Sequence, residues 1–112
     1  QVRDLLHVDD LFRCFESAIA QIDVAAGRAY NVGGGPSNTV SVWLELGPIL
    51  EDMLGQPTTP QFAPWRLGDQ RVFVADITKA GRELGWSPTI SPDTGLRRLV
   101  DWVRSTELPA LP

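Results

Sequence analysis

The 112-residue chain holds one cluster of charged side chains that could bind a ligand, in the segment from Pro64 to Asp76. Arg66, Asp69 and Arg71 follow one another between a proline-rich stretch and a short apolar run, where the pattern predicts a loop. Guanidinium groups suit phosphate oxygens, and a carboxylate can accept hydrogen bonds from sugar hydroxyls. The alternative interpretation is a solvated turn with an Asp–Arg surface pair.

The composition argues against several other classes of protein. The net charge is −4, so the sequence does not predict a nucleic-acid-binding face. The single cysteine, Cys14, excludes an internal disulfide and a cysteine-based zinc site, and we expect it to pack inside the protein. The sequence has no apolar run long enough to predict a membrane span. Neither Met nor a recognisable signal peptide stands at Gln1, so we expect a cytoplasmic protein and a piece of a longer polypeptide.

No catalytic set is recognisable in the sequence. The chain has one histidine, His7, and lacks the Gly-x-Ser-x-Gly and His-x-x-x-His patterns. Because His7 lies in an apolar stretch, we expect it to be a hydrogen-bonded structural residue. The triple glycine at 33–35 follows a predicted strand, but the next helix begins several residues later. A tight turn is therefore favoured over a cofactor-binding loop.

The hydrophobic pattern predicts a small α+β unit over residues 1–105, a helical lobe with a few short strands. Strands are expected over residues 2–8, 28–33, 61–63 and 72–74. This is too little sheet for a complete doubly wound domain. Residues 106–112 give no reason to expect order, and we predict a disordered tail there.

Capping residues and apolar spacing predict four helices. They are expected from Asp9 or Asp10 to about Gly27, from Ser41 to Gly55, from Ile77 to Leu84 after a cap at Asp76, and from Pro92 to about Arg104 with a cap at Ser91. Pro48 should kink the second helix or remove one of its hydrogen bonds. The apolar residues of the first and last helices should face the core, namely Leu11, Phe12, Phe15, Ala18, Ile19, Ile22, Leu96, Leu99, Val100 and Val103.

The four tryptophans are many for a chain of this length. We expect Trp43, Trp86 and Trp102 to pack between helices. Trp65 precedes Arg66, and three interpretations stay open for it: it lines a pocket, stacks on a base, or contacts a part of the protein outside this chain. A lobe separated from such a part should also expose an unusually large apolar patch.

Four segments, taken together and in this order, resemble the extended short-chain dehydrogenases, that is, the NAD-dependent nucleotide-sugar epimerase and dehydratase family. They are Arg3–Asp10, Tyr30–Gly34, Asp69–Ala80 and Leu84–Pro88. The segment Asp69–Asp76 is most similar to the CDP-paratose (CDP-tyvelose) 2-epimerase branch. The resemblance implies that the chain is the C-terminal, substrate-binding portion of an α/β, Rossmann-type parent protein.

The resemblance also implies a site for a nucleoside-diphosphate sugar, with a CDP-sugar favoured. Arg3 and Arg66 would hold the diphosphate, and Asp69 would accept hydrogen bonds from the ribose hydroxyls. Arg71 has no clear counterpart in the family and is expected to pair with Asp69. None of these residues is expected to be catalytic.

The family's NAD-binding glycine turn and its Tyr-x-x-x-Lys pair have no counterpart in this chain. The resemblance therefore implies that NAD is bound by an N-terminal part absent from the chain. The whole enzyme would oxidise a sugar carbon by hydride transfer to NAD and return the hydride to the other face, and a homodimer is expected. Two alternatives stay open, a dehydratase of the same family and a non-catalytic nucleotide-binding or interaction module.

Overall fold

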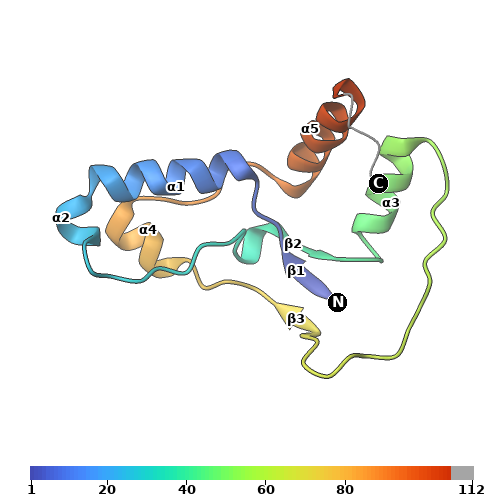
Figure 1. Cartoon of the computed structure of the whole chain (residues 1–112), viewed down its shortest axis with the longest axis horizontal. Helices are drawn as coiled ribbons and strands as arrows, with labels where there is room; N and C mark the ends of the chain where they lie inside the picture. Colours follow the sequence, from blue (N-terminus) through green and yellow to red (C-terminus); the bar gives the residue numbers. More distant parts are fainter. Residues whose placement is uncertain (107–112) are drawn as a thin grey trace, which may run out of the picture.

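The structure is a computed structural model in which residues 1–106 are described (Figure 1). Its elements in chain order are β1 (Val2–Asp4), α1 (Val8–Ala20), α2 (Ile22–Ala25), a 3-10 turn (Pro36–Asn38), β2 (Thr39–Ser41), α3 (Leu46–Leu54), β3 (Val72–Phe73), α4 (Thr78–Leu84) and α5 (Pro92–Ser105). The prediction of an α+β lobe with short strands is confirmed. Of the predicted tail at 106–112, only Thr106 belongs to the described residues.

The three strands form one small sheet in the order β2-β1-β3. β1 pairs antiparallel with β2, and Arg3 lies opposite Val40. β1 also pairs in parallel with β3, and Arg3 lies opposite Phe73 on this side. The long segment that leads from α3 to β3 runs around the outside of the lobe and returns to the edge of this sheet (Figure 1). The start of the chain therefore lies next to the loop that precedes β3.

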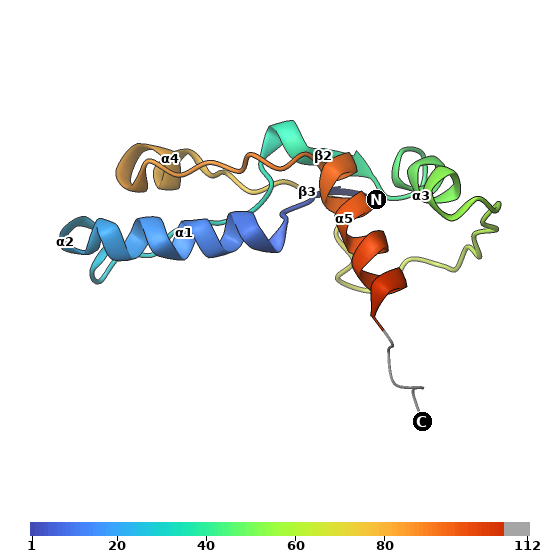
Figure 2. The ribbon, with the colours of Figure 1, turned by 90° about the horizontal axis from the view of Figure 1, so that it is seen from above.

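The core of the lobe lies between α1 and α4, which run side by side in both views (Figures 1 and 2). Its buried residues are Cys14, Ala80, Leu84 and Trp86. The indole N–H of Trp86 donates to the Asp10 carbonyl oxygen at 2.9 Å. Burial raises the pKa of the Cys14 thiol, and the expectation that Cys14 is a packing residue is confirmed.

The prediction that Asp9 or Asp10 caps α1 was wrong. His7 is the cap, and its Nδ1 accepts the Asp9 backbone N–H at 3.1 Å. The carboxylate of Asp10 is fully buried inside the first turn. It accepts the backbone N–H groups of Thr89 and Ile90 at 3.1 and 2.9 Å and forms an ion pair with Arg13. Asp10 therefore connects α1 to the segment before α5, a role that depends on residues far along the chain.

Two predicted strands, residues 28–33 and 61–63, are irregular in the structure. A strand needs a hydrogen-bonded neighbour, and neither segment pairs with another strand among residues 1–106. β2, which the sequence analysis did not predict, forms because β1 provides such a neighbour on its other side.

The second predicted helix begins later than expected, at Leu46 and not next to Ser41. The Ser41 hydroxyl accepts the Leu44 N–H at 3.3 Å in a turn that precedes the helix. Pro48 consequently lies in the first turn of α3, where backbone N–H groups have no partner within the helix. The expected kink is thus not needed, and the expected loss of a helical hydrogen bond does not arise.

Several apolar side chains that were predicted to face the core lie on the surface. One row runs along α1 into α2, and we call it the α1 stripe; it consists of Val8, Phe12, Phe15, Ile19 and Ile22, each more than half exposed. On α5, Leu99, Trp102 and Val103 are also exposed, and no residue of that helix is buried. The Cα radius of gyration is 16.8 Å, against about 13 Å for a compact domain of 100 residues. The lobe therefore has an open apolar face, as expected.

Candidate functional site

The sheet brings the first predicted site residue, Arg3, to the charged loop. Because β1 and β3 are parallel neighbours, the side chain of Arg3 reaches the segment just before β3. Its Nη2 donates to the Gln70 carbonyl oxygen at 2.7 Å, and its Nη1 donates to the Val2 carbonyl oxygen at 2.7 Å. Arg3 is thereby connected to the residue that follows Asp69.

The second and third predicted residues, Arg66 and Asp69, contact each other directly. The Asp69 carboxylate accepts hydrogen bonds from the backbone N, Nε and Nη2 of Arg66 at 3.2, 3.4 and 3.3 Å. The hydrogen bond from the Arg66 backbone, followed by those from its side chain, lowers the pKa of Asp69, and the charge of Arg3 adds to this effect. The Arg66 side chain is 85% exposed and that of Asp69 is 22% exposed. The guanidinium group is thus free to meet a ligand from solvent.

The expectation that Arg71 pairs with Asp69 was wrong. The Arg71 guanidinium lies over the indole of Trp65, with 5.2 Å between its Cζ and the ring centroid. Asp69 pairs with Arg66 instead. Trp65 and Arg71 are therefore brought together by the same loop that holds Arg66 and Asp69.

Trp65, Arg66 and Asp69 line a depression of about 670 Å³ at the edge of the lobe. Its other walls come from the start of the chain, from the turn before α3 and from the proline-rich segment, namely Gln1, Val42, Trp43, Pro60, Gln61, Phe62, Ala63 and Pro64. Arg3 does not line it but contacts the loop from the sheet side. The depression combines aromatic walls with a cation and a carboxylate, which suits a planar and polar anionic ligand. Trp43 and Phe62 were missed, because only the return of a long segment places them there.

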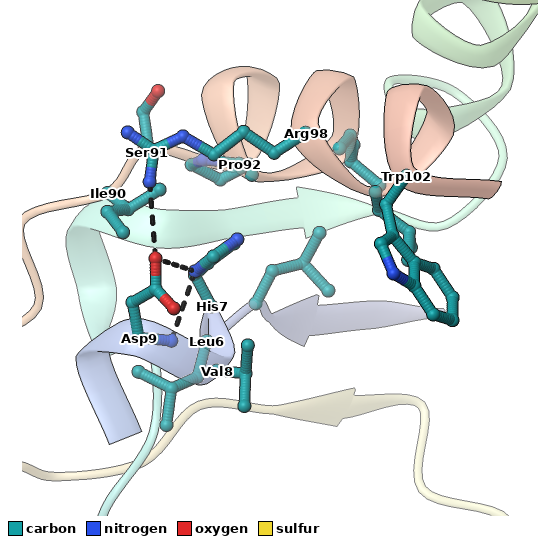
Figure 3. A pocket seen from close by; sticks show the side chains of 13 residues that line it. Leu6, His7, Val8, Asp9, Ile90, Ser91, Pro92, Arg98 and Trp102 are labelled. Atoms are coloured by element: carbon teal, nitrogen blue, oxygen red, sulfur yellow. Dashed lines mark hydrogen bonds and ion pairs between the residues drawn. The ribbon is translucent and has the colours of Figure 1, made fainter. Parts of the chain in front are cut away.

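A second hollow, of about 700 Å³, lies between the start of α1 and α5 (Figure 3). Most of its lining is apolar, including Leu6, Val8 and Trp102. At one edge the Asp9 carboxylate lies 3.4 Å from Arg98 Nη1 and 3.5 Å from His7 Nδ1. His7 is hydrogen-bonded as expected, but as the cap of α1 and not within a strand, and the charges of Asp9 and Arg98 at this edge are paired with each other. We find no arrangement of a nucleophile with a base here.

The chain has curated relatives that match it over nearly its full length. It is 40% identical over 105 residues to the CDP-paratose 2-epimerase of Salmonella typhi, an alignment that covers 94% of this chain and 31% of the relative. It is 34% identical over 102 residues to the UDP-glucuronate 4-epimerase of Thermodesulfobacterium geofontis, covering 91% of this chain and 30% of that one. No family model matches the chain.

Solved structures of nucleotide-sugar epimerases share the fold of this chain. A UDP-glucuronic acid 4-epimerase from Bacillus cereus, in complex with NAD and UDP-4-deoxy-4-fluoro-glucuronic acid, matches with a TM-score of 0.81 and 31% identity over 93% of this chain and 32% of that one. The UDP-glucose 4-epimerase of Bifidobacterium longum, in complex with NAD+ and UDP, matches with a TM-score of 0.79 and 33% identity over 94% of this chain and 30% of that one. Over nearly its full length, the chain is therefore similar to nucleotide-sugar epimerases.

The chain spans about 30% of the length of the curated relatives it matches. The relatives include dehydratases as well as epimerases, for example the dTDP-glucose 4,6-dehydratase of Streptomyces griseus, which is 36% identical over 101 residues. The expected resemblance to extended short-chain dehydrogenases is therefore confirmed at the level of the family.

The triple glycine at 33–35 is closely packed by other groups of the chain. A Cβ on Gly34 would lie 2.1 Å from the Leu5 carbonyl oxygen, and one on Gly33 would lie 2.5 Å from Asp4 Oδ2. The same Asp4 oxygen accepts the backbone N–H groups of Gly35 and Ala75 at 3.0 and 3.1 Å. Groups of the chain itself therefore occupy the space beside the glycines, and the interpretation as a close-packed turn is confirmed.

The part of the chain that the structure describes holds neither a metal-binding cluster nor a membrane-spanning helix. Among residues 1–106, no group of three or more His, Cys, Asp or Glu side chains could hold a metal ion. None of the helices in the same range is long and apolar enough to cross a bilayer. The candidate site is thus the depression with its charged loop.

Proposed function

We propose that this chain is the substrate-holding portion of an NAD-dependent nucleoside-diphosphate-sugar epimerase. In this proposal Arg3 and Arg66 bind the diphosphate, and Asp69 binds the ribose. The main support for this proposal is that all three residues lie at one loop. Arg66 and Asp69 line the depression, and Arg3 contacts the same loop through Gln70. NAD would be held by a part of the enzyme outside this chain.

The geometry gives each residue a chemical task. Arg66 is exposed, and its planar guanidinium can exchange the Asp69 carboxylate for two oxygens of a diphosphate. Asp69 would then have free lone pairs to accept hydrogen bonds from two ribose hydroxyls. Arg3 would add positive charge and hold the loop in place through its hydrogen bond to Gln70. Ligand binding should therefore break the Arg66–Asp69 pair.

The α1 stripe supports the proposal that the lobe functions as part of a larger enzyme. Val8, Phe12, Phe15 and Ile19 leave an apolar row on the surface of a helix whose other side packs on α4. Burying such side chains against another element would contribute roughly 1.5–3 kcal/mol each. The relatives are about three times as long as this chain, so they contain elements that could cover this row.

Within the family, a CDP-sugar epimerase is favoured by the 40% identity to CDP-paratose 2-epimerase. The second candidate is a nucleotide-sugar dehydratase, which the 36% identity to the Streptomyces griseus enzyme supports. The third is a nucleotide-binding or interaction module without chemistry of its own, which the lack of a recognised catalytic pair in this chain supports.

One experiment separates these candidates. The natural polypeptide that carries this sequence is incubated with NAD and with CDP-, UDP- and dTDP-sugars, and the products are identified by NMR and mass spectrometry. Inversion of a sugar carbon at constant mass supports the epimerase. Loss of water from the sugar supports the dehydratase, and nucleotide binding without any product supports the module. Absence of binding to all three nucleotide sugars would refute the proposal.

A further inference from the structure

The charged loop carries an aromatic surface that the proposed roles of Arg3, Arg66 and Asp69 do not use. The indole of Trp65 lines the same depression and is 53% exposed. A large aromatic ring with that exposure lacks about half of the stabilisation that full burial would contribute. Its position directly before Arg66 places this ring next to the proposed diphosphate site.

The contact with Arg71 gives the indole a defined arrangement. The Arg71 guanidinium lies 5.2 Å from the centroid of the ring, a distance at which a cation is attracted to the face of an indole. Within the part of the chain that the structure describes, this guanidinium forms no hydrogen bond or ion pair. Stacking on Trp65 is thus the contact that the structure shows for this guanidinium. A cation on one face leaves the other face for a ligand.

We infer that Trp65 is the stacking platform for the nucleobase of the nucleotide sugar, and that Arg71 is a positioning residue that holds the indole in place. This inference rests on the proposed function, since it assigns the base of the ligand whose diphosphate and ribose contact Arg66 and Asp69. Every nucleobase offers a flat aromatic face, so stacking adds affinity without selecting among bases. Selection among cytosine, uracil and thymine would depend on other contacts.

The test measures binding by calorimetry in the natural polypeptide that carries this sequence, with CDP, UDP and inorganic pyrophosphate as probes. Trp65→Leu should weaken CDP and UDP by the same factor, roughly tenfold or more, because base–aromatic stacking is lost. Pyrophosphate has no base, and its affinity should not change. Trp65→Phe keeps an aromatic face and should retain most of the affinity for both nucleotides.

Three further variants complete the test. Trp102 is 56% exposed and lies in the other hollow, so Trp102→Leu removes an equally exposed indole and should leave all three affinities unchanged. Arg71→Gln should weaken CDP but not pyrophosphate, whereas Arg71→Lys, which keeps the cation, should restore CDP binding. In addition, CDP should change the indole fluorescence of the wild type and of Trp102→Leu. The change should be much smaller in Trp65→Phe, which lacks the indole at the base.

The outcomes are distinguishable. An unchanged CDP affinity in Trp65→Leu would overturn the inference and leave the proposed function standing. Equal losses for CDP and pyrophosphate would also overturn it, since they would mean that Trp65 only maintains the loop. A wild-type protein that binds neither nucleotide nor pyrophosphate would overturn the proposed function together with the inference.

Discussion

Arg3, at the start of the chain, donates a 2.7 Å hydrogen bond to the carbonyl oxygen of Gln70, which lies 67 residues later. The parallel pairing of β1 with β3 makes this contact possible. Gln70 follows Asp69, so Arg3 both adds charge near the candidate site and fixes the loop that forms it. Because Arg3 has both roles, its substitution should affect the loop as well as ligand binding, whereas substitution of Arg66 should affect mainly ligand binding.

Arg3→Ala should weaken nucleotide-sugar binding and also loosen the loop, because the Gln70 carbonyl loses its partner. Hydrogen exchange of the backbone amides at residues 66–71 should become faster in the free protein. Arg3→Lys should restore part of the charge but not the hydrogen-bond geometry of the guanidinium. Unchanged exchange rates in Arg3→Ala would show that Arg3 does not maintain the loop.

Arg66→Ala should weaken binding of a nucleoside diphosphate by roughly 1.5–3 kcal/mol, the range for hydrogen bonds to charged groups. Titration calorimetry with CDP and UDP measures this difference. Arg97→Ala is the matched control, since Arg97 pairs with Asp93 on α5 at 3.0 Å, away from the depression. Equal affinities for Arg66→Ala and wild type would remove Arg66 from the site.

The buried carboxylate of Asp10 should be critical for stability. Its oxygens accept the backbone N–H groups of Thr89 and Ile90 and pair with Arg13, so Asp10→Ala would leave both N–H groups without this acceptor and would remove the ion pair of Arg13. We expect a loss of about 3 kcal/mol, at the lower end for a broken buried pair because the Arg13 side chain is 41% exposed. Urea unfolding measures it.

Asp9→Ala provides the control for this prediction. Asp9 is the preceding residue, its side chain is 61% exposed, and it pairs with Arg98 at the surface. Its loss should cost less than about 1 kcal/mol. Similar losses for the two variants would show that the burial of Asp10 is not what matters.

Acid should destabilise the lobe in part through Glu83. Hydrogen bonds from Arg82 and then from Tyr30 lower the pKa of Glu83 below its ordinary value of 4.5. A carboxylate whose pKa is lower in the folded state stabilises the fold above its unfolded pKa, and this contribution is lost as the pH falls through the folded pKa. The urea midpoint of the wild type should therefore fall more steeply below about pH 4.5 than that of Glu83→Gln. Parallel pH profiles would contradict this role.

Local signals in the sequence were sufficient for the end of α4 and the start of α5. Gly85 ends α4 in the left-handed conformation, with φ of +66°. The hydroxyl of Ser91 accepts the Thr94 N–H at 3.3 Å, and Pro92 takes the first helical position. These effects involve residues a few positions apart, so the sequence alone can show them.

The features that the sequence did not reveal depend on distant partners. From the sequence, Asp10 is predicted to be a helix cap. In the structure its carboxylate accepts the backbone N–H groups of Thr89 and Ile90, which lie far along the chain. In the candidate site, Asp69 pairs with Arg66 and not with Arg71, although both arginines lie within three residues of it in the sequence. The stacking of Arg71 on Trp65 does not follow from spacing, because it depends on how the loop turns before β3.

The α1 stripe leads to the last prediction. As an isolated 112-residue chain, the lobe should bind an apolar fluorescent dye or self-associate, because Phe12 and Ile19 are 64% and 71% exposed. The double variant Phe12→Ser and Ile19→Ser should reduce dye binding and association. Leu67→Ser is the control, since Leu67 is fully exposed but stands apart from the stripe. A wild-type chain that is monomeric by light scattering and binds no dye would mean that the stripe does not need a partner, which would count against the proposal that the lobe packs on the rest of an enzyme.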